Sequence, residues 1–262
     1  MGTVTGRQTG GARRAPVVAC LWLTVLCLAA AQAEEPPHGI DLRLEHTPGE
    51  LLGTEEAARY RRILDPDRPL SWDVYYPAGG GDQLPGVLVY ISPGPSGRID
   101  PRWRRVMDEM NLIYIAANDS GNRVRTNRRM VLAVFAVRAL NRRFEFDASR
   151  IRVAGFSGGG RVASLVASQY PEAFTGALYI CGADFWKKSR TPNVERLIRN
   201  RFVFVTGPGD FNQSEMRRVH QRYLKAGAGN SKLMVIPGMG HELPDAAVLT
   251  RALAYLAGDD PD

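Results

Sequence analysis

The sequence predicts an α/β fold, a mostly parallel twisted sheet with helices on both of its faces. Short apolar runs rich in β-branched and aromatic residues recur along the chain, and segments with helical spacing of apolar residues separate them. Strands that are joined through helices pair in parallel, and the helices then cover both faces of the sheet. The 262 residues, 44% of them hydrophobic, suffice for one domain with a substantial core.

The first expected strand is the alternating run LSWDVYYP at 70–77, which a glycine-rich turn joins to the apolar run VLVYI at 87–91 in a hairpin-like pair. The later strands are continuous apolar runs, as buried parallel strands are. They are expected at residues 112–117, 150–155, 174–182, 202–207 and 232–238. Helices are expected at residues 127–144, 158–170, 193–200, 214–227 and 245–258.

The first 33 residues have the pattern of a secretory signal peptide. A basic segment with three arginines precedes an apolar run at 15–31, and Ala-Gln-Ala at 31–33 is a small-x-small cleavage site. An uncleaved anchor is the alternative, although the apolar run is short for a membrane span. We therefore expect a secreted or periplasmic protein with no stable membrane anchor after cleavage.

The segment 34–68 is polar and rich in proline and charge. We expect it to form an N-terminal arm with a short helix near residues 55–64. The α/β domain, which would carry any catalytic site, is then expected at 69–262.

Charge and cysteine content narrow the function classes. Cleavage after residue 33 removes three arginines and no acidic residue, so the formal charge falls from +7 to +4. The arginines in RWRR at 102–105 and RVRTNRR at 123–129 lack the aromatic interleaving of single-strand binders, and we interpret them as solvated helix faces. We therefore expect no nucleic-acid partner. Cys181 is the one cysteine after residue 33, and its apolar surroundings indicate a small buried side chain.

One serine stands among four glycines in VAGFSGGGRVA at 153–163, where an expected strand meets an expected helix. The motif G-x-S-x-G spans 155–159, with Ser157 at its centre. At such a turn the serine backbone is strained and its Oγ is exposed, while side chains at the two outer glycines would clash. Gly158 can turn its N–H toward a developing oxyanion. Glycine-rich turns of this kind also bind phosphate, but the lysine of the phosphate-binding loop is absent.

A candidate acid and a candidate base follow in chain order. Asp210 lies in the loop after the strand at 202–207, and His241 lies in the loop after the last strand. The order serine, aspartate, histidine is that of a nucleophile-elbow hydrolase, and all three loops leave the same edge of the predicted sheet. The imidazole would take the hydroxyl proton of Ser157, and Asp210 would hold the required tautomer. Asp184, one strand earlier, is the alternative acid.

A second oxyanion donor is expected in the loop SPGPSG at 92–97. Its two prolines have no N–H, which makes Gly94 the first candidate, with Ser96 and Gly97 as alternatives. The prolines would also fix the loop in advance. Asn118 and Trp186 lie on loops at the same edge and are candidates for a substrate pocket, the alternative being ordinary loop structure.

The run FDASRIRVAGFSGGGRVASLVASQYPEAFTGALYICG at 146–182 resembles secreted serine esterases of the polyhydroxybutyrate depolymerase and feruloyl esterase type, within the α/β-hydrolase superfamily. In that family an Asp-x-x-Arg strand leads to G-x-S-x-G-G, a helix and a Tyr-Pro-x-x-Phe turn. The matching residues here are Asp147, Arg150, Ile151, Tyr170, Pro171 and Phe174.

The resemblance covers roughly residues 70–258. It implies the α/β-hydrolase fold, with Ser157 as nucleophile, Asp210 as acid and His241 as base. The chain departs from the family at 92–94, where Ser-Pro-Gly replaces the usual His-Gly motif.

We therefore expect a secreted serine hydrolase that cleaves carboxylic esters through an acyl-enzyme. Its substrate would be a small-molecule or polymeric ester, and no metal or organic cofactor is expected. Two alternatives stay open. One is a serine peptidase of the prolyl-oligopeptidase type, and the other is a non-catalytic exported binding protein on the same fold.

Overall fold

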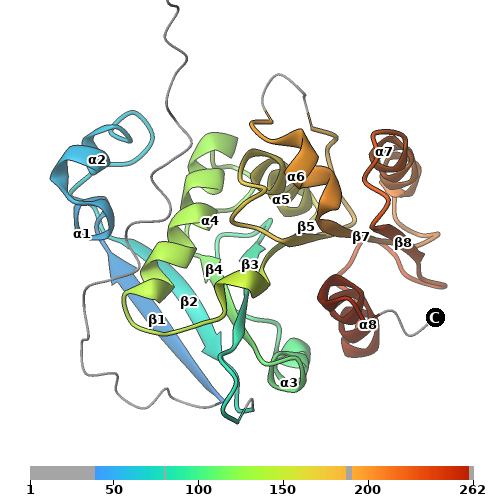
Figure 1. Cartoon of the computed structure of the whole chain (residues 1–262), viewed down its shortest axis with the longest axis horizontal. Coiled ribbons are helices and arrows are strands. Elements are labelled where there is room, and N and C mark those ends of the chain that lie inside the picture. The colour runs from blue at the N-terminus through green and yellow to red at the C-terminus, as the bar shows by residue number, and fades with distance from the viewer. Residues whose placement is uncertain (1–38, 80, 187–190, 260–262) are drawn as a thin grey trace, which may run out of the picture. The chain divides into compact units, whose positions relative to one another are not determined.

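A computed structural model of the chain describes residues 39–79, 81–186 and 191–259 (Figure 1). The predicted signal segment at 1–33 lies outside these residues. The strands are β1 (Ile40–His46), β2 (Leu70–Tyr76), β3 (Gly86–Ile91), β4 (Leu112–Ala117), β5 (Ile151–Phe156), β6 (Gly176–Ile180), β7 (Arg201–Thr206) and β8 (Ser231–Val235). The α-helices are α1 (Pro48–Leu52), α2 (Thr54–Ala58), α3 (Arg104–Glu109), α4 (Thr126–Asn141), α5 (Gly158–Gln169), α6 (Val194–Arg199), α7 (Gln213–Lys225) and α8 (Ala246–Ala257).

The described strands form one sheet in the order β1-β2-β4-β3-β5-β6-β7-β8. β1 and β2 run antiparallel to their neighbours, and all other pairs are parallel. Figure 1 shows β1 and β2 on one side of the molecule and β8 on the other. The predicted mostly parallel sheet is thus confirmed.

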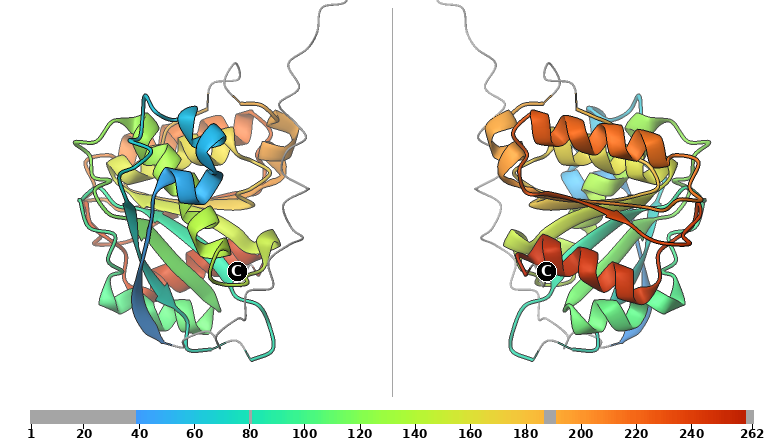
Figure 2. Two further views of the ribbon diagram at one scale, coloured as in Figure 1. Left: turned by 90° about the vertical axis from the view of Figure 1, so that its left-hand side faces the viewer. Right: turned by 90° about the vertical axis from the view of Figure 1, so that its right-hand side faces the viewer.

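Two groups of helices cover the two faces of the sheet, as predicted. Helices α4, α5 and α7 bury their apolar side chains in one cluster of core residues, and α3 and α8 bury theirs in a second cluster. Figure 2 shows α7 and α8 on opposite sides of the strands. Within the described part of the chain, no helix is long and apolar enough to cross a membrane.

The edge strand β1 corrects the prediction for the N-terminal arm. Residues 40–46 pair with β2 along their whole length, and Leu44 is buried. Apolar residues alternate with polar ones in IDLRLEH, which is the signal of a half-buried strand that the charge-rich composition of 34–68 obscured. The short helix expected near 55–64 is instead α1 and α2, followed by turns.

The hairpin-like pairing of 70–77 with 87–91 is also wrong. β2 pairs with β1 and β4, and β4 separates it from β3. All six residues of β3 are buried, so this strand needs a neighbour on each side, and it takes the parallel strands β4 and β5.

The strand order reverses direction at β3. The chain steps from β3 to β4 toward one edge of the sheet and then places β5 on the other side of β3. In open parallel sheets, ligands bind outside the carboxyl ends of the strands at such a switch point. The loop at 92–97 and the turn at Ser157 leave the sheet at this point.

Candidate active site

Ser157 occupies a sharp turn between β5 and α5. Its backbone has φ 56° and ψ −123°, a left-handed conformation that a residue with a side chain rarely adopts. The Ser157 N–H donates to the carbonyl of Ile180 at 2.7 Å, which holds the turn against β6. Such strain costs about 1–3 kcal/mol and persists only where the surrounding structure imposes it.

The glycines around Ser157 are required by close backbone approach, as the sequence predicts. A Cβ at Gly155 would lie 2.4 Å from the Gly159 carbonyl carbon, and a Cβ at Gly159 would lie 1.9 Å from the Ile91 oxygen. A Cβ at Gly160, for which the sequence suggested only helix packing, would lie 2.1 Å from the oxygen of Gly182. Helix α5 therefore rests directly on the backbone of β3 and of the segment after β6.

The structure brings the three predicted catalytic side chains together. His241 Nε2 lies 2.9 Å from Ser157 Oγ, and His241 Nδ1 lies 2.8 Å from Asp210 Oδ1. The three residues leave the carboxyl ends of β5, β7 and β8, as predicted. Asp210 is buried, whereas the His241 side chain keeps 19% of its surface exposed.

Several groups hold the Asp210 carboxylate in place. The Thr206 hydroxyl donates to Oδ2 at 2.6 Å, and the Asn212 N–H donates to Oδ1 at 2.9 Å. Burial would raise the pKa of Asp210, but the hydrogen bonds from Thr206, His241 and Asn212 outweigh it and hold this pKa below its ordinary value.

The ionised state of Asp210 decides the tautomer of His241. A carboxylate only accepts hydrogen bonds, so Nδ1 of His241 carries the proton that is donated to Asp210. Nε2 is then free of a proton and accepts from the Ser157 hydroxyl. In this arrangement the imidazole is oriented to remove the proton from Ser157.

Two aromatic rings lie against the His241 imidazole. The Phe211 ring stacks on it with centroids 3.9 Å apart, and the Phe156 ring lies 5.0 Å away. Phe211 is 76% exposed, which is unusual for so large an apolar side chain. The sequence predicted neither contact, nor the supporting donors Thr206 and Asn212. Their positions beside Asp210 in the chain were the available signal.

The two candidate oxyanion donors differ in their present partners. Gly158 is the first residue of α5, and its N–H has no acceptor among the described residues. The Gly94 N–H donates to Ser92 Oγ at 3.0 Å, within its own loop. Gly94 would have to release Ser92 before it could donate to a substrate. The alternative donor Gly97 is also engaged, because its N–H donates to Asn118 Oδ1 at 2.9 Å.

The candidate pocket residues have different positions. Asn118 braces the loop at 92–97 through its bond from Gly97, and its own N–H donates to Ser71. Trp186 is 4% exposed, and its ring packs against Phe185 and Tyr223 at 4.3 and 4.5 Å. This packing fits the alternative of ordinary loop structure, because the ring belongs to the aromatic core on the α7 side of the sheet.

The alternative acid Asp184 faces another partner. Arg161 on α5 forms ion pairs with Asp184 at 3.3 Å and with both carboxylate oxygens of Glu215. Asp184 has no hydrogen bond to His241 within the described residues. The geometry therefore favours Asp210 as the acid.

Cys181 lies beside the aspartate and histidine. One ligand atom each from Cys181, Asp210 and His241 lies within 4.8 Å of the others. Burial and the nearby Asp210 charge raise the pKa of the Cys181 thiol far above its usual range. A metal would require the thiolate and would displace the proton on Nδ1, so these residues suit a hydrogen-bonded pair better than a metal site.

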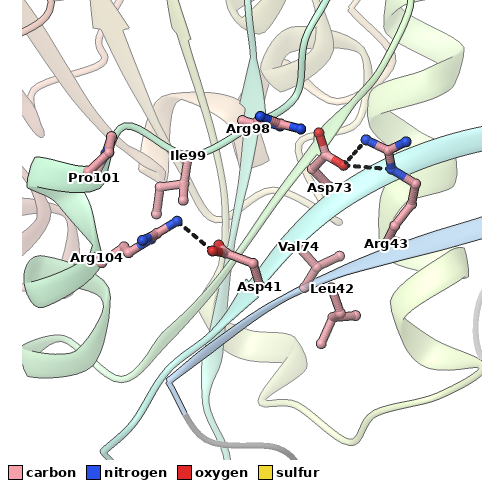
Figure 3. A pocket seen from close by; sticks show the side chains of 9 residues that line it. All are labelled: Asp41, Leu42, Arg43, Asp73, Val74, Arg98, Ile99, Pro101 and Arg104. Atoms are coloured by element: carbon pink, nitrogen blue, oxygen red, sulfur yellow. Dashed lines mark hydrogen bonds and ion pairs between the residues drawn. The ribbon is translucent and has the colours of Figure 1, made fainter.

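A separate cavity of about 690 Å³ lies between the strands β1 and β2 and the segment 98–104 (Figure 3). Arg43 pairs with Asp73 there, and Arg104 pairs with Asp41. The lining residues are Asp41, Leu42, Arg43, Asp73, Val74, Arg98, Ile99, Pro101 and Arg104. None of them is a predicted site residue, so this charged cavity and the group around Ser157 are distinct features.

Comparison with known proteins identifies relatives by structure. No family model matches the chain, and no curated protein sequence matches it. An arylesterase aligns with a TM-score of 0.58 at 14% identity, over 87% of this chain and 86% of that one. A structure from a study of two fungal esterases of Rhizomucor miehei aligns with a TM-score of 0.61 at 13% identity, over 86% of this chain and 84% of that one. A ferulic acid esterase aligns with a TM-score of 0.59 at 13% identity, over 85% of this chain and 100% of that one.

At such low identity the likeness concerns the fold. The strand order, the antiparallel β2 and the aligned structures agree that this chain has the α/β-hydrolase fold. The fold that the sequence resemblance implied is thereby confirmed.

Proposed function

We propose that this protein is a serine hydrolase that cleaves carboxylic esters through an acyl-enzyme. The continuous hydrogen-bonded chain from Ser157 through His241 to Asp210 carries the proposal. The strained turn that exposes Ser157 and the esterases among the structural neighbours support it. The ferulic acid esterase also agrees with the esterase type that the sequence resembles.

In the proposed reaction, Ser157 Oγ attacks the ester carbonyl while His241 Nε2 takes the hydroxyl proton. The carbonyl oxygen becomes an oxyanion, which the Gly158 N–H stabilises together with a second donor from the loop at 92–97. His241 then gives the proton to the alcohol, which leaves, and Ser157 carries the acyl group. Water attacks the acyl-enzyme with His241 as the base, and the acid product leaves.

Asp210 contributes through His241. It holds the proton on Nδ1 and stabilises the imidazolium that forms in each step. Phe211 covers one face of the ring and limits its rotation. Because Asp210 is buried among donors, its charge is less screened by water than that of a surface carboxylate.

A short-chain aryl ester and a fluorophosphonate probe test this proposal. We expect the wild-type chain to hydrolyse the ester, and labelling of Ser157 by the probe to abolish turnover. Ser157→Ala should lose about 10⁶-fold in kcat. Ser168→Ala is the matched control, since this buried serine on α5 donates only to the Leu165 carbonyl and should keep wild-type kinetics.

Three outcomes would contradict the proposal. Absence of both turnover and labelling in the wild type would favour a non-catalytic binding protein. Turnover that survives in Ser157→Ala would require another nucleophile. Faster cleavage of a peptide amide than of the ester would favour the peptidase alternative, for which an aligned putative dipeptidyl aminopeptidase IV is the structural precedent, with this chain spanning 35% of its length.

We also propose that the protein is exported. The basic segment and apolar run before residue 33 support this. Expression of the full chain in a secreting host, followed by the mass of the exported product, tests it. A mature N-terminus near residue 34 is expected, and retention of the intact chain inside the cell would contradict the proposal.

A further inference from the structure

A buried arginine links the loops around Ser157. Arg129 lies in the first turn of α4 and is 4% exposed. Its Nε donates to the Ser120 carbonyl at 2.8 Å, one terminal nitrogen donates to the Ser92 carbonyl at 2.9 Å, and the other lies 3.3 Å from the Gly158 carbonyl. One guanidinium therefore ties together the segments that follow β3, β4 and β5.

The partners of Arg129 include both segments that carry predicted oxyanion donors. Ser92 begins the loop that contains Gly94, and the backbone carbonyl oxygen of Ser92 accepts a hydrogen bond from Arg129. Gly158 supplies the first N–H of α5, and its own carbonyl accepts from the same guanidinium. A rigid planar fork with fixed donor directions sets the distance between these two segments.

The charge of Arg129 has no counterion among the described residues. Burial lowers the pKa of Arg129, and no neighbouring carboxylate counters that effect. The guanidinium also lies near the N-termini of α4 and α5, where the helix dipoles are positive and disfavour a cation. Carbonyl oxygens satisfy its donors, but its net charge is not neutralised.

We propose that Arg129 is a positioning residue of the acyl-transfer site, an inference that rests on the proposed function. It holds the loop at 92–97 and the start of α5 in register, so that their N–H groups can converge on one oxygen. Its unneutralised charge makes this region electropositive before substrate arrives. The developing oxyanion then supplies the missing negative charge, which favours the transition state over the neutral ester.

Arg152 provides a matched control at the opposite edge of the sheet. It is also buried, and it donates to the carbonyls of Leu256 and Arg150. Burial lowers its pKa to about 10. Its main partner lies in the last turn of α8, far along the chain from Ser157, so its removal tests the structural effect of losing a buried arginine.

The experiment compares Arg129→Met, Arg129→Lys and Arg152→Met with the wild type. We measure kcat and KM on a short-chain aryl ester, the affinity for a boronic acid that forms an anionic tetrahedral adduct, and thermal unfolding. Arg129→Met should lower kcat and boronic acid affinity by the same factor, about 100-fold, with little change in KM. Arg129→Lys keeps the charge but lacks the fork, and should lose roughly tenfold. Arg152→Met should lower the unfolding temperature and keep wild-type kcat.

The inference is overturned if Arg129→Met keeps wild-type kcat, if its boronic acid affinity is unchanged, or if Arg152→Met loses kcat equally at the same folded fraction. If Arg129→Met does not fold, Arg129→Lys decides, since wild-type kinetics in that variant would rule out a positioning role. An inactive and unlabelled wild type would instead overturn the proposed function, which separates the two failures.

Discussion

Buried polar groups have different roles at the amino ends and at the carboxyl ends of the strands. At the edge where the strands begin, Arg152 donates to the last turn of α8, and buried Asn200 donates to the carbonyls of Pro171 and Phe174. At the edge where the strands end, Arg129 and Asp210 are buried beside Ser157. A cation at a helix C-terminus is stabilised by about 0.3–1 kcal/mol, whereas one near helix N-termini is disfavoured by a similar amount.

Residue type and burial alone do not predict the role of a buried arginine, because its position relative to the helix ends also matters. Arg129 and Arg152 are both buried arginines, and both donate their hydrogen bonds to backbone carbonyl oxygens. Arg152 complements the dipole of α8 and closes a helix end, while Arg129 opposes two helix dipoles. Arg152 at the amino ends of the strands therefore supports stability, whereas Arg129 at the carboxyl ends is disfavoured by two helix dipoles, in keeping with the positioning role proposed for it.

After Ser157→Ala, the largest expected effect at the carboxyl ends of the strands comes from Asp210→Asn. The amide would favour the wrong tautomer of His241, and kcat on an aryl ester should fall by about 10⁴-fold. The unfolding temperature should fall moderately at neutral pH, because the amide lacks the charge and the second acceptor oxygen that the donors around Asp210 bind. A loss of kcat below tenfold in a folded variant would rule out Asp210 as the acid and reopen the case for Asp184.

Gly159→Ala tests how tightly the backbone is packed at the carboxyl ends of the strands. Its Cβ would lie 1.9 Å from the Ile91 oxygen, so α5 would have to move off β3. We expect a loss of more than about 4 kcal/mol in the free energy of unfolding, and little soluble protein. Gly229→Ala, in the turn before β8, meets nothing within 4 Å and should change stability by less than about 0.5 kcal/mol. Equal denaturant midpoints for the two variants would contradict this prediction.

The ionisation of Asp210 should make the free energy of unfolding depend on pH in acid. Its pKa is lower in the folded chain than the ordinary value of 3.8, so its ionised form stabilises the fold above that pH. This contribution is lost as pH falls through the lowered folded pKa. The difference in unfolding free energy between the wild type and Asp210→Asn should therefore shift against the wild type in acid. Urea titrations from pH 6 to pH 3 measure it, and a constant difference would contradict the assigned pKa direction.

The smallest expected effect is that of Phe211→Ala. The exposed ring stacks on His241, and an aromatic contact of this kind contributes about 0.5–1.5 kcal/mol. We expect kcat to fall by roughly threefold, and the free energy of unfolding by no more than about 1.5 kcal/mol. Leu224→Ala is the control, since this partly exposed apolar residue lies near the C-terminal end of α7. Identical kinetics in all three proteins would show that the stack does not orient the imidazole.

The group around Ser157 was predictable because its causes are local. The glycine pattern marks a sharp strand-to-helix turn, and Asp210 and His241 each follow soon after an apolar strand. The parallel sheet then brings the three loops to one edge. The edge strand β1 was not predicted, although its alternation is also local, because the charge-rich and proline-rich composition of 34–68 is typical of a solvated arm.

Arg129 was not predictable from its surroundings in the chain. It stands next to Arg128 in RVRTNRR, and the sequence predicted that this whole run is solvated, which Arg129 corrects. Burial of Arg129 depends on the phase of α4 and on carbonyls that lie 37 residues earlier and 29 residues later in the chain. Engagement of the Gly94 N–H by Ser92 likewise depends on the loop conformation, which two prolines constrain but do not specify.

The contacts of Gly155, Gly159 and Gly160 join backbone to backbone. The turn that carries Ser157 is therefore held largely by neighbouring backbone. Loop residues at this edge can change in size and polarity while the reactive hydroxyl stays where it is. If the proposed function holds, substitutions in these loops can change the acyl and alcohol preference of the site while the turn at Ser157 stays the same.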